Sequence, residues 1–253
     1  MKVGETIMNS TIDLLKNHSS FRSFEKKPVS NEQRDTIFQA ASHSSSFSLL
    51  QTVSIIRISD QELRKKVNNL CFNQPYIEEA GEFWIFCADF NRNHQMAPSV
   101  DLSYIEYLLI GTFDAGIMAQ NALTAAESLG LGGVYIGAVR GNIQELSDLL
   151  ELPEYVIPLV GLCIGHPKGE KPDSKPKLPQ EIVMSENTYK PLNKDSLDIY
   201  DQHMKHYYEN RSSRAPFTAR TVKGWSDHIQ DHLERSSLTF MKEYLNKQGF
   251  AKK

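Results

Sequence analysis

A long apolar segment that stops at a glycine is the strongest constraint on how this chain folds. Apolar residues occupy most faces of a helical pattern over residues 103–129, and Gly130 follows immediately. Glycine accepts the left-handed backbone conformation in which many helices end. A β-rich run that contains Gly132 and Gly133 then continues to Gly137. The sequence therefore predicts a buried helix and, after a tight turn, a strand whose backbone a flat ligand can approach.

The same helix argues against a membrane protein. The longest apolar stretch, about residues 100–129, contains the acidic residues Asp101, Glu106, Asp114 and Glu127. Charged side chains are costly inside a bilayer, so this pattern indicates a core helix or a dimer-interface helix. The first residues also lack the basic and apolar layout of a signal peptide. We expect a cytoplasmic protein with no membrane attachment.

Composition narrows the class further. The 253 residues are enough for a substantial core, and the formal net charge of −3 gives no electrostatic reason to expect nucleic-acid binding. The three cysteines, Cys71, Cys87 and Cys163, are widely spaced and odd in number. Such spacing favours buried free thiols over a disulfide framework or a metal site.

Local patterns predict one α+β domain over residues 1–253, with a mostly antiparallel central sheet and a helical C-terminal excursion at about 190–250. Apolar and β-branched runs predict strands at residues 50–58, 83–90, 133–137 and 157–164. Helices are predicted at residues 11–17, from Ser30 onward, from Asp60 to Leu70, and at 103–129, 142–150, 195–209, 226–235 and 238–247. Ser30 and Gln33 have the spacing of a capping box.

Three familiar kinds of site are not indicated. The glycines near 130 follow a helix and lack the Gly-x-Gly-x-x-Gly spacing of a dinucleotide-binding turn. The pairs His228/His232 and His203/His206 lie at helical spacing but have no evident third ligand, so solvated helix faces are the simpler interpretation. We predict no metal site and no catalytic nucleophile or dedicated acid–base residue.

Several words of the sequence together resemble a known family. These are Ala119-Gln120-Asn121, residues 125–137, Tyr207-Tyr208-Glu209-Asn210-Arg211 and Gly224-Trp225-Ser226-Asp227. They resemble the flavin reductase P and oxygen-insensitive NADPH nitroreductase branch of the nitroreductase family, from about Ile12 to the C-terminus. The resemblance implies a nitroreductase-like homodimer that binds FMN at the subunit interface. It also implies ping-pong hydride transfer from NADPH, through FMN N5, to nitroaromatics, quinones or free flavin.

The resemblance assigns FMN contacts to five segments. His18, Ser20 and Arg22 match a motif that grips FMN, and Ser46 and Ser48 match a serine-rich run around it. Gln74 matches a reader of the flavin pyrimidine edge, while Gly137 offers its backbone N–H to N5. Lys175 and Lys177 can both meet one phosphate if the chain between them is extended. The complete set adds Tyr135, Ile136 and Ala138, and Arg211 is placed to meet the 2′-phosphate of NADPH.

Several positions depart from the family pattern, and simpler interpretations stay open. Ser19, Phe47, Ala138, Lys177 and Leu238 replace the usual residues, while Glu106 and Arg140 match polar positions of lower weight. Taken alone, the segment around Arg22 could be a polar helix end, and Lys175-Pro176-Lys177 a solvated basic loop. The alternative functions are a divergent flavin-binding protein with little turnover and an NADH-preferring flavin reductase.

Overall fold

A four-stranded sheet organises the larger part of the chain. Its strands are β1 (Val53–Arg57), β2 (Glu82–Asp89), β3 (Gly132–Ile136) and β4 (Val156–Gly165), in the order β1-β2-β4-β3. All three pairings are antiparallel, with one irregularity in β2 between Phe86 and Cys87. The predicted α+β architecture and all four predicted strands are confirmed, with small shifts at the strand ends.

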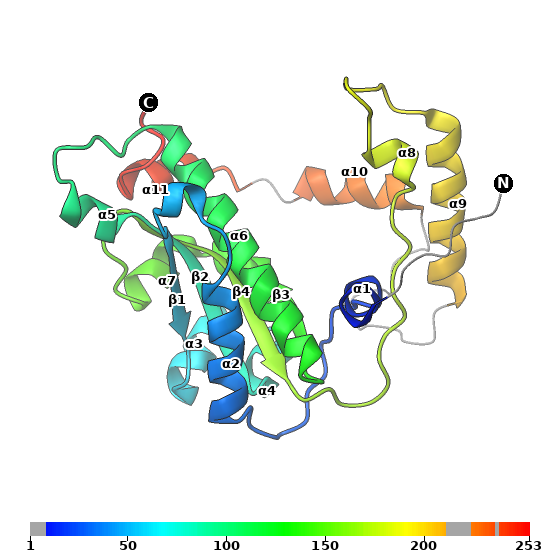
Figure 1. Cartoon of the computed structure of the whole chain (residues 1–253), viewed down its shortest axis with the longest axis horizontal. Helices are drawn as coiled ribbons and strands as arrows, with labels where there is room; N and C mark the ends of the chain where they lie inside the picture. The colour runs from blue at the N-terminus through cyan, green and yellow to red at the C-terminus, as the bar shows by residue number, and fades with distance from the viewer. Residues whose placement is uncertain (1–8, 211–223, 236–237) are drawn as a thin grey trace. The chain divides into compact units, whose positions relative to one another are not determined.

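Both faces of the sheet are covered, as the alternation in β2 shows. Phe83, Ile85 and Cys87 belong to one apolar cluster, whereas Trp84 and Phe86 belong to another. Successive side chains of a strand point to opposite faces, so each cluster lies on its own side of the sheet. Helices α6 and α2 run side by side over the second cluster, and α3 and α4 pack on the first (Figure 1). This double burial explains why β2 reads as an uninterrupted apolar run.

The computed structural model describes residues 9–210, 224–235 and 238–253, which form two compact units. Among the described residues, the first unit comprises 9–171 and 239–253, and the second comprises 172–210, 224–235 and 238. The single-domain reading stays a prediction. No helix in the described ranges is both long enough and apolar enough to cross a membrane. The helices of the first unit are α1 (Ser10–Lys16), α2 (Asn31–Ser42), α3 (Gln61–Leu70), α4 (Pro75–Glu79), α5 (Asn91–Met96), α6 (Ile105–Ser128), α7 (Ile143–Leu149) and α11 (Met241–Lys247).

Local sequence signals correctly predicted the start of α2 and the end of α6. The Ser30 hydroxyl accepts from the Gln33 backbone N–H at 3.1 Å, and the Gln33 side chain accepts from the Ser30 N–H, so the capping box is confirmed. Helix α6 ends with Gly130 at φ +75°. The Leu131 N–H donates to Ala126 O and the Gly130 N–H to Glu127 O, both at 3.0 Å, which is a Schellman ending. The turn that leads into β3 is therefore built by glycine, as predicted.

One face of α6 differs from the expectation of burial along most of its length. Ile110, Ala115 and other residues on its inner face are buried, but Leu109 is 57% exposed and Phe113 is 74% exposed. In a single copy of this chain, α6 packs on the sheet with one face only. The apolar character around the helix therefore reflects two surfaces, of which the second is an exposed apolar stripe.

The sequence did not predict the shortest helical elements. These are α4, α5 and two 3₁₀ turns, η1 (Phe47–Leu49) and η2 (Gly137–Arg140), in the first unit, and α8 (Gln180–Val183) in the second. Elements of one or two turns carry too few residues for a periodic signal. The remaining helices of the second unit, α9 (Lys194–Asn210) and α10 (Trp225–Arg235), agree with the predicted ranges.

Candidate functional site

The predicted segment His18–Arg22 connects α1 to the edge strand β3. The Phe21 N–H donates to Gly133 O at 2.9 Å, and a Cβ on Gly132 would lie 2.9 Å from the Phe21 side chain. Glycine at 132 is thus required for this close approach. His18 Nδ1 lies 2.7 Å from the Glu127 carboxylate near the end of α6. These contacts fix the segment along the strand that leads to Gly137.

Tyr76, which was not among the site residues predicted from the sequence, lies near both Arg22 and Gln74. The Tyr76 hydroxyl donates to Gln74 Oε1, and Gln74 Nε2 donates to Cys71 O at 2.9 Å. Burial raises the pKa of Tyr76, while the nearby positive charge of Arg22 opposes that rise. The phenol therefore orients the Gln74 amide and lies near the guanidinium.

The end of β3 supplies an open stretch of backbone. Ile136 is buried, and the Tyr135 hydroxyl donates to Gln120 Oε1 at 3.3 Å. Burial, together with the charge of Glu127, raises the pKa of Tyr135. A Cβ on Gly137 would meet nothing nearer than Arg140 Nη2 at 3.5 Å, so space lies beside this residue. The 3₁₀ turn η2 begins at Gly137, and its second residue, Ala138, packs against the core.

The segments around Phe21, Tyr76 and Ile136 pack on the same apolar cluster. Phe21, Ile136 and Val139 are buried in the cluster on the α3 side of the sheet, and Tyr76 and Ala138 pack against it. Residues 21–22, 74–76 and 136–139, which are distant in the sequence, are thus near one another on this side of the sheet. Tyr135 packs instead against the cluster on the α6 side, and His18 pairs with Glu127 of α6.

Two polar atoms in this region are buried without a hydrogen-bond partner. They are Ser19 Oγ and His166 Nε2. The backbone of His166, just after β4, accepts a hydrogen bond from the Glu25 N–H at 2.9 Å, so His166 lies beside the segment that contains Ser19. Buried polar atoms are normally paired, and an unpaired one requires an explanation such as a ligand.

Ser46 lies in a different pocket of the same unit. Its volume is about 830 Å³, and its lining includes Ser44, Ser45, Ser46 and Asp114 but neither Arg22 nor Gln74. Ser48 is in η1, at φ +46°, and is not part of that lining. The serine-rich turn and the segment around Arg22 therefore form separate surfaces within one copy of the chain.

Asp114 anchors the serine-rich turn. This carboxylate is 3% exposed; it accepts from the Phe47 N–H at 3.0 Å and from the Thr52 hydroxyl at 2.8 Å. Ser48 and Gln51 both have positive φ values, which residues other than glycine rarely adopt. Sequence motifs do not predict this role for Asp114, because a single buried carboxylate belongs to no recognisable pattern.

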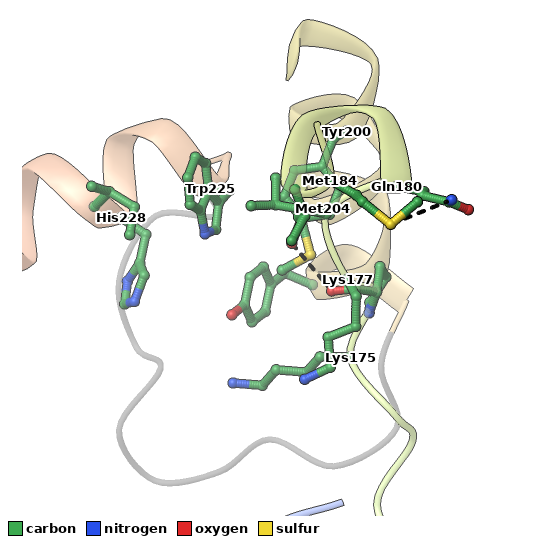
Figure 2. A pocket seen from close by; sticks show the side chains of 13 residues that line it. Lys175, Lys177, Gln180, Met184, Tyr200, Met204, Trp225 and His228 are labelled. Carbon is green, nitrogen blue, oxygen red and sulfur yellow. Dashed lines mark hydrogen bonds between the residues drawn. The ribbon is translucent and has the colours of Figure 1, made fainter. Parts of the chain in front are cut away.

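Lys175 and Lys177 lie in the second unit, where they line a cavity of about 770 Å³. Figure 2 shows them on one side of this cavity and Trp225 and His228, from α10, on another. The Tyr200 hydroxyl donates to Pro176 O at 3.1 Å and so fixes the chain between the two lysines. Lys175 Nζ lies 5.9 Å from the centre of the Tyr208 ring, within cation–π range.

The remaining candidates fall outside these groups. Arg211 lies outside the described residues. Arg140 donates to Leu159 O, a backbone contact that ties η2 to β4, while Glu106 and Leu238 are exposed. Among the described residues, no group of three or more His, Cys, Asp or Glu side chains has the arrangement of a metal site. The three cysteines are buried and free, as predicted.

Comparison with known proteins identifies the family. A model of the nitroreductase family matches residues 15–104 and 109–166, and a model of the nitroreductase family C-terminal domain matches residues 175–253. The chain belongs to the nitroreductase family. It is therefore an oxidoreductase, and the resemblance noted in the sequence is confirmed.

Similar proteins extend over the whole chain. An oxygen-insensitive NADPH nitroreductase of Salmonella typhimurium is 49% identical over 244 residues, covering 96% of this chain and 99% of the relative. The structure of nitroreductase A from Vibrio parahaemolyticus has a TM-score of 0.90 at 43% identity, covering 97% of this chain and all of that one. The NADPH:FMN oxidoreductase from Vibrio harveyi, solved with NAD⁺, gives 0.88 at 42% identity, with coverage of 97% and 100%. The nitroreductase-like fold is confirmed.

Proposed function

We propose that this nitroreductase-family protein is an FMN-dependent oxidoreductase that uses NADPH to reduce nitroaromatics, quinones or free flavin. The observation that carries the proposal is the hydrogen bond from Tyr76 to Gln74, near the charge of Arg22, on the apolar cluster against which Ala138, the neighbour of Gly137, also packs. The relatives named as NADPH nitroreductase and NADPH:FMN oxidoreductase support the same conclusion.

The residues present fit the chemistry of FMN. The unpartnered Ser19 Oγ and the nearby Ser20 hydroxyl suit ribityl or phosphate oxygens, and Arg22 supplies positive charge beside Gln74. Space beside Gly137 would accommodate a flat ring against a main-chain N–H. When bound, FMN would supply the hydride chemistry, since it takes electrons from NADPH and passes them to an acceptor.

The side chains around the pyrimidine edge would select one amide orientation. Gln74 Oε1 already accepts from Tyr76, and Gln74 Nε2 already donates to Cys71 O. An amide has two donor hydrogens and an acceptor oxygen with two lone pairs, so one donor and one acceptor remain for a ligand. Arg22 would hold the negative charge that develops when a flavin is reduced, because its guanidinium stays protonated.

The basic residues outside the first unit have predicted roles of their own. Lys175 and Lys177 would bind the FMN phosphate, and Arg211 the 2′-phosphate of NADPH. Both roles stay predictions. Lysine provides charge without the bidentate fork of arginine, so Lys177 would bind a phosphate with less geometric selectivity than an arginine.

We also propose a homodimer. The exposed stripe formed by Ile105, Leu109 and Phe113 on α6 is an apolar surface that a second copy can cover. The separation of Ser46 from Arg22 within one copy supports the idea that two subunits contribute to each FMN site. An apparent molecular mass of one copy in solution, measured by light scattering, would contradict this proposal.

An anaerobic visible spectrum tests the function directly. The purified protein is titrated with FMN and then given one equivalent of NADPH. Loss of the flavin absorption band at about 450 nm is expected, because reduction bleaches the oxidised ring. A bound flavin that stays oxidised with both NADPH and NADH would favour a flavin-binding protein without turnover. Absence of flavin binding would overturn the site.

The donor preference has its own test. Arg211→Ala should raise KM for NADPH far more than KM for NADH, because only NADPH carries a 2′-phosphate. Equal turnover of the unaltered protein with both donors would instead favour an NADH-using or unselective flavin reductase.

A further inference from the structure

An exposed aromatic residue in a strained backbone precedes the candidate flavin reader Gln74. Phe72 has φ +62° and Asn73 has φ +53°. The left-handed region is rare for bulky residues, and such outliers concentrate at functional sites. Phe72 is 64% exposed, whereas its neighbour Cys71 is fully buried. The ring therefore adds little buried apolar area to the core, and core packing does not offset the strain of its backbone.

The backbone around Phe72 is held by the end of α3. The Asn73 N–H donates to Asn68 O at 2.9 Å, and the Phe72 N–H donates to Asn69 O at 3.3 Å. The Asn142 side chain donates to Leu70 O at 2.7 Å, which ties the end of α3 to the start of α7. The turn is thus fixed on both sides.

The Phe72 ring lies against Gly141. A Cβ built on Gly141 would lie 2.4 Å from Phe72 Cε2 and 2.5 Å from Cζ. Gly141 has φ −68° and ψ −45°, a conformation open to any residue, so the ring rather than the backbone requires glycine here. Its N–H donates to Ala138 O at 2.9 Å, which closes η2.

This contact places Phe72 at the edge of the candidate site. Gly137 is the first residue of η2 and Gly141 follows its last, and a 3₁₀ turn rises about 2 Å per residue, or about 8 Å over four residues. Gln74 follows Phe72 by two positions in the chain. An exposed aromatic ring thus lies against the residue that follows η2 and two positions before Gln74, both in segments that are proposed to bind the flavin.

We propose that Phe72, seated on Gly141, is a specificity-determining residue that stacks against flat aromatic electron acceptors beside the flavin. The inference rests on the proposed function and deepens it, because it names the aromatic ring of the acceptor as what is recognised. Aromatic pairs gain from offset-stacked or edge contacts in addition to the area they bury.

A comparison of two acceptors tests this role. 1,4-Naphthoquinone takes two electrons and two protons per NADPH oxidised, and ferricyanide takes one electron per ion and offers no aromatic face. Phe72→Leu and Phe72→Gly should lower the ratio of kcat/KM for naphthoquinone to that for ferricyanide by about three- to tenfold, chiefly through KM. Phe240→Leu, at an exposed aromatic residue without an assigned role, is the matched control.

A double-mutant cycle separates the ring from general disturbance. Gly141→Ala should displace the ring and lower the same ratio in the unaltered background, but have little further effect in Phe72→Gly, where no ring remains. Phe72→Gly should melt at the same temperature or higher, because glycine adopts positive φ without strain.

The outcomes distinguish the two proposals. Unchanged acceptor ratios in variants that still bind FMN and accept electrons from NADPH would overturn the role of Phe72 while leaving the proposed function intact. Unchanged ratios accompanied by loss of the dimer would also overturn it, since Phe72 would then be a subunit contact. Failure of the unaltered protein to bind FMN or oxidise NADPH would instead remove the proposed function.

Discussion

Two polar regions of the first unit differ in how completely their groups are paired. Around Glu82, every charged group has partners: the carboxylate accepts from Arg57 at 2.6 and 2.8 Å and from Trp84 Nε1 at 2.9 Å. Around residues 18–25, by contrast, Ser19 Oγ and His166 Nε2 are buried without partners. The first arrangement stabilises the fold. The second leaves buried polar atoms unpaired, which agrees with the ligand site proposed above.

The largest effect is expected from breaking the paired network. Glu82 is 2% exposed, so Glu82→Ala should leave the Trp84 N–H and part of Arg57 without an acceptor. The free energy of unfolding should fall by about 3 kcal/mol. Urea denaturation measures the change, and Lys65→Ala, which removes an exposed ion pair with Glu62, should cause a far smaller one. Similar losses in both variants would contradict the assignment of Glu82 to a structural network.

Removal of Arg22 should weaken FMN binding and leave stability nearly unchanged, whereas removal of Glu82 should mainly lower stability. Arg22 is exposed in the free protein, so Arg22→Ala should leave the unfolding free energy nearly unchanged. FMN affinity should fall about 10- to 100-fold, because a charge-assisted hydrogen bond is lost. Fluorescence titration of FMN gives the dissociation constant, and Arg22→Lys, which keeps the charge, should show an intermediate value. An affinity equal to that of the unaltered protein would remove Arg22 from the site.

Alkaline pH should destabilise the core through its thiols. Burial raises the pKa of Cys71 to about 12, above about 8.5 in an unfolded chain. The stabilisation is fully present below the unfolded value and is lost as pH rises toward the folded one. Cys71→Ala should therefore reduce the loss of unfolding free energy between about pH 7 and pH 10 by about 1–2 kcal/mol. Parallel pH profiles of the two proteins would show that Cys71 is not protected by burial.

The smallest expected effect concerns Gly137. A methyl group there meets no protein atom within 3.5 Å, so Gly137→Ala should leave stability within about 0.5 kcal/mol of the unaltered value. It should weaken FMN binding about fivefold, or about 1 kcal/mol, because the methyl group would enter the proposed ring site. Thermal melting and FMN titration on the same sample check both parts. Unchanged affinity would mean that no ring approaches this backbone.

Much of the fold was accessible from local sequence. The capping box at Ser30, the N-cap at Asp60 and the glycine ending of α6 are each set by residues within one turn of one another. The four strands follow from short apolar and β-branched runs. The family resemblance likewise depends on contiguous words. These features need no knowledge of what packs against them, so the sequence predicts them directly.

The tertiary structure decided the relations between distant residues. It determined that Tyr76 bonds to Gln74 near the charge of Arg22, that Asp114 holds the serine-rich turn, and that Phe72 requires glycine at position 141. Each of these depends on contacts between segments that no local pattern relates. Periodicity and short motifs determine which residues form elements; only packing determines which side chains meet, because burial and hydrogen-bond geometry arise when the elements come together.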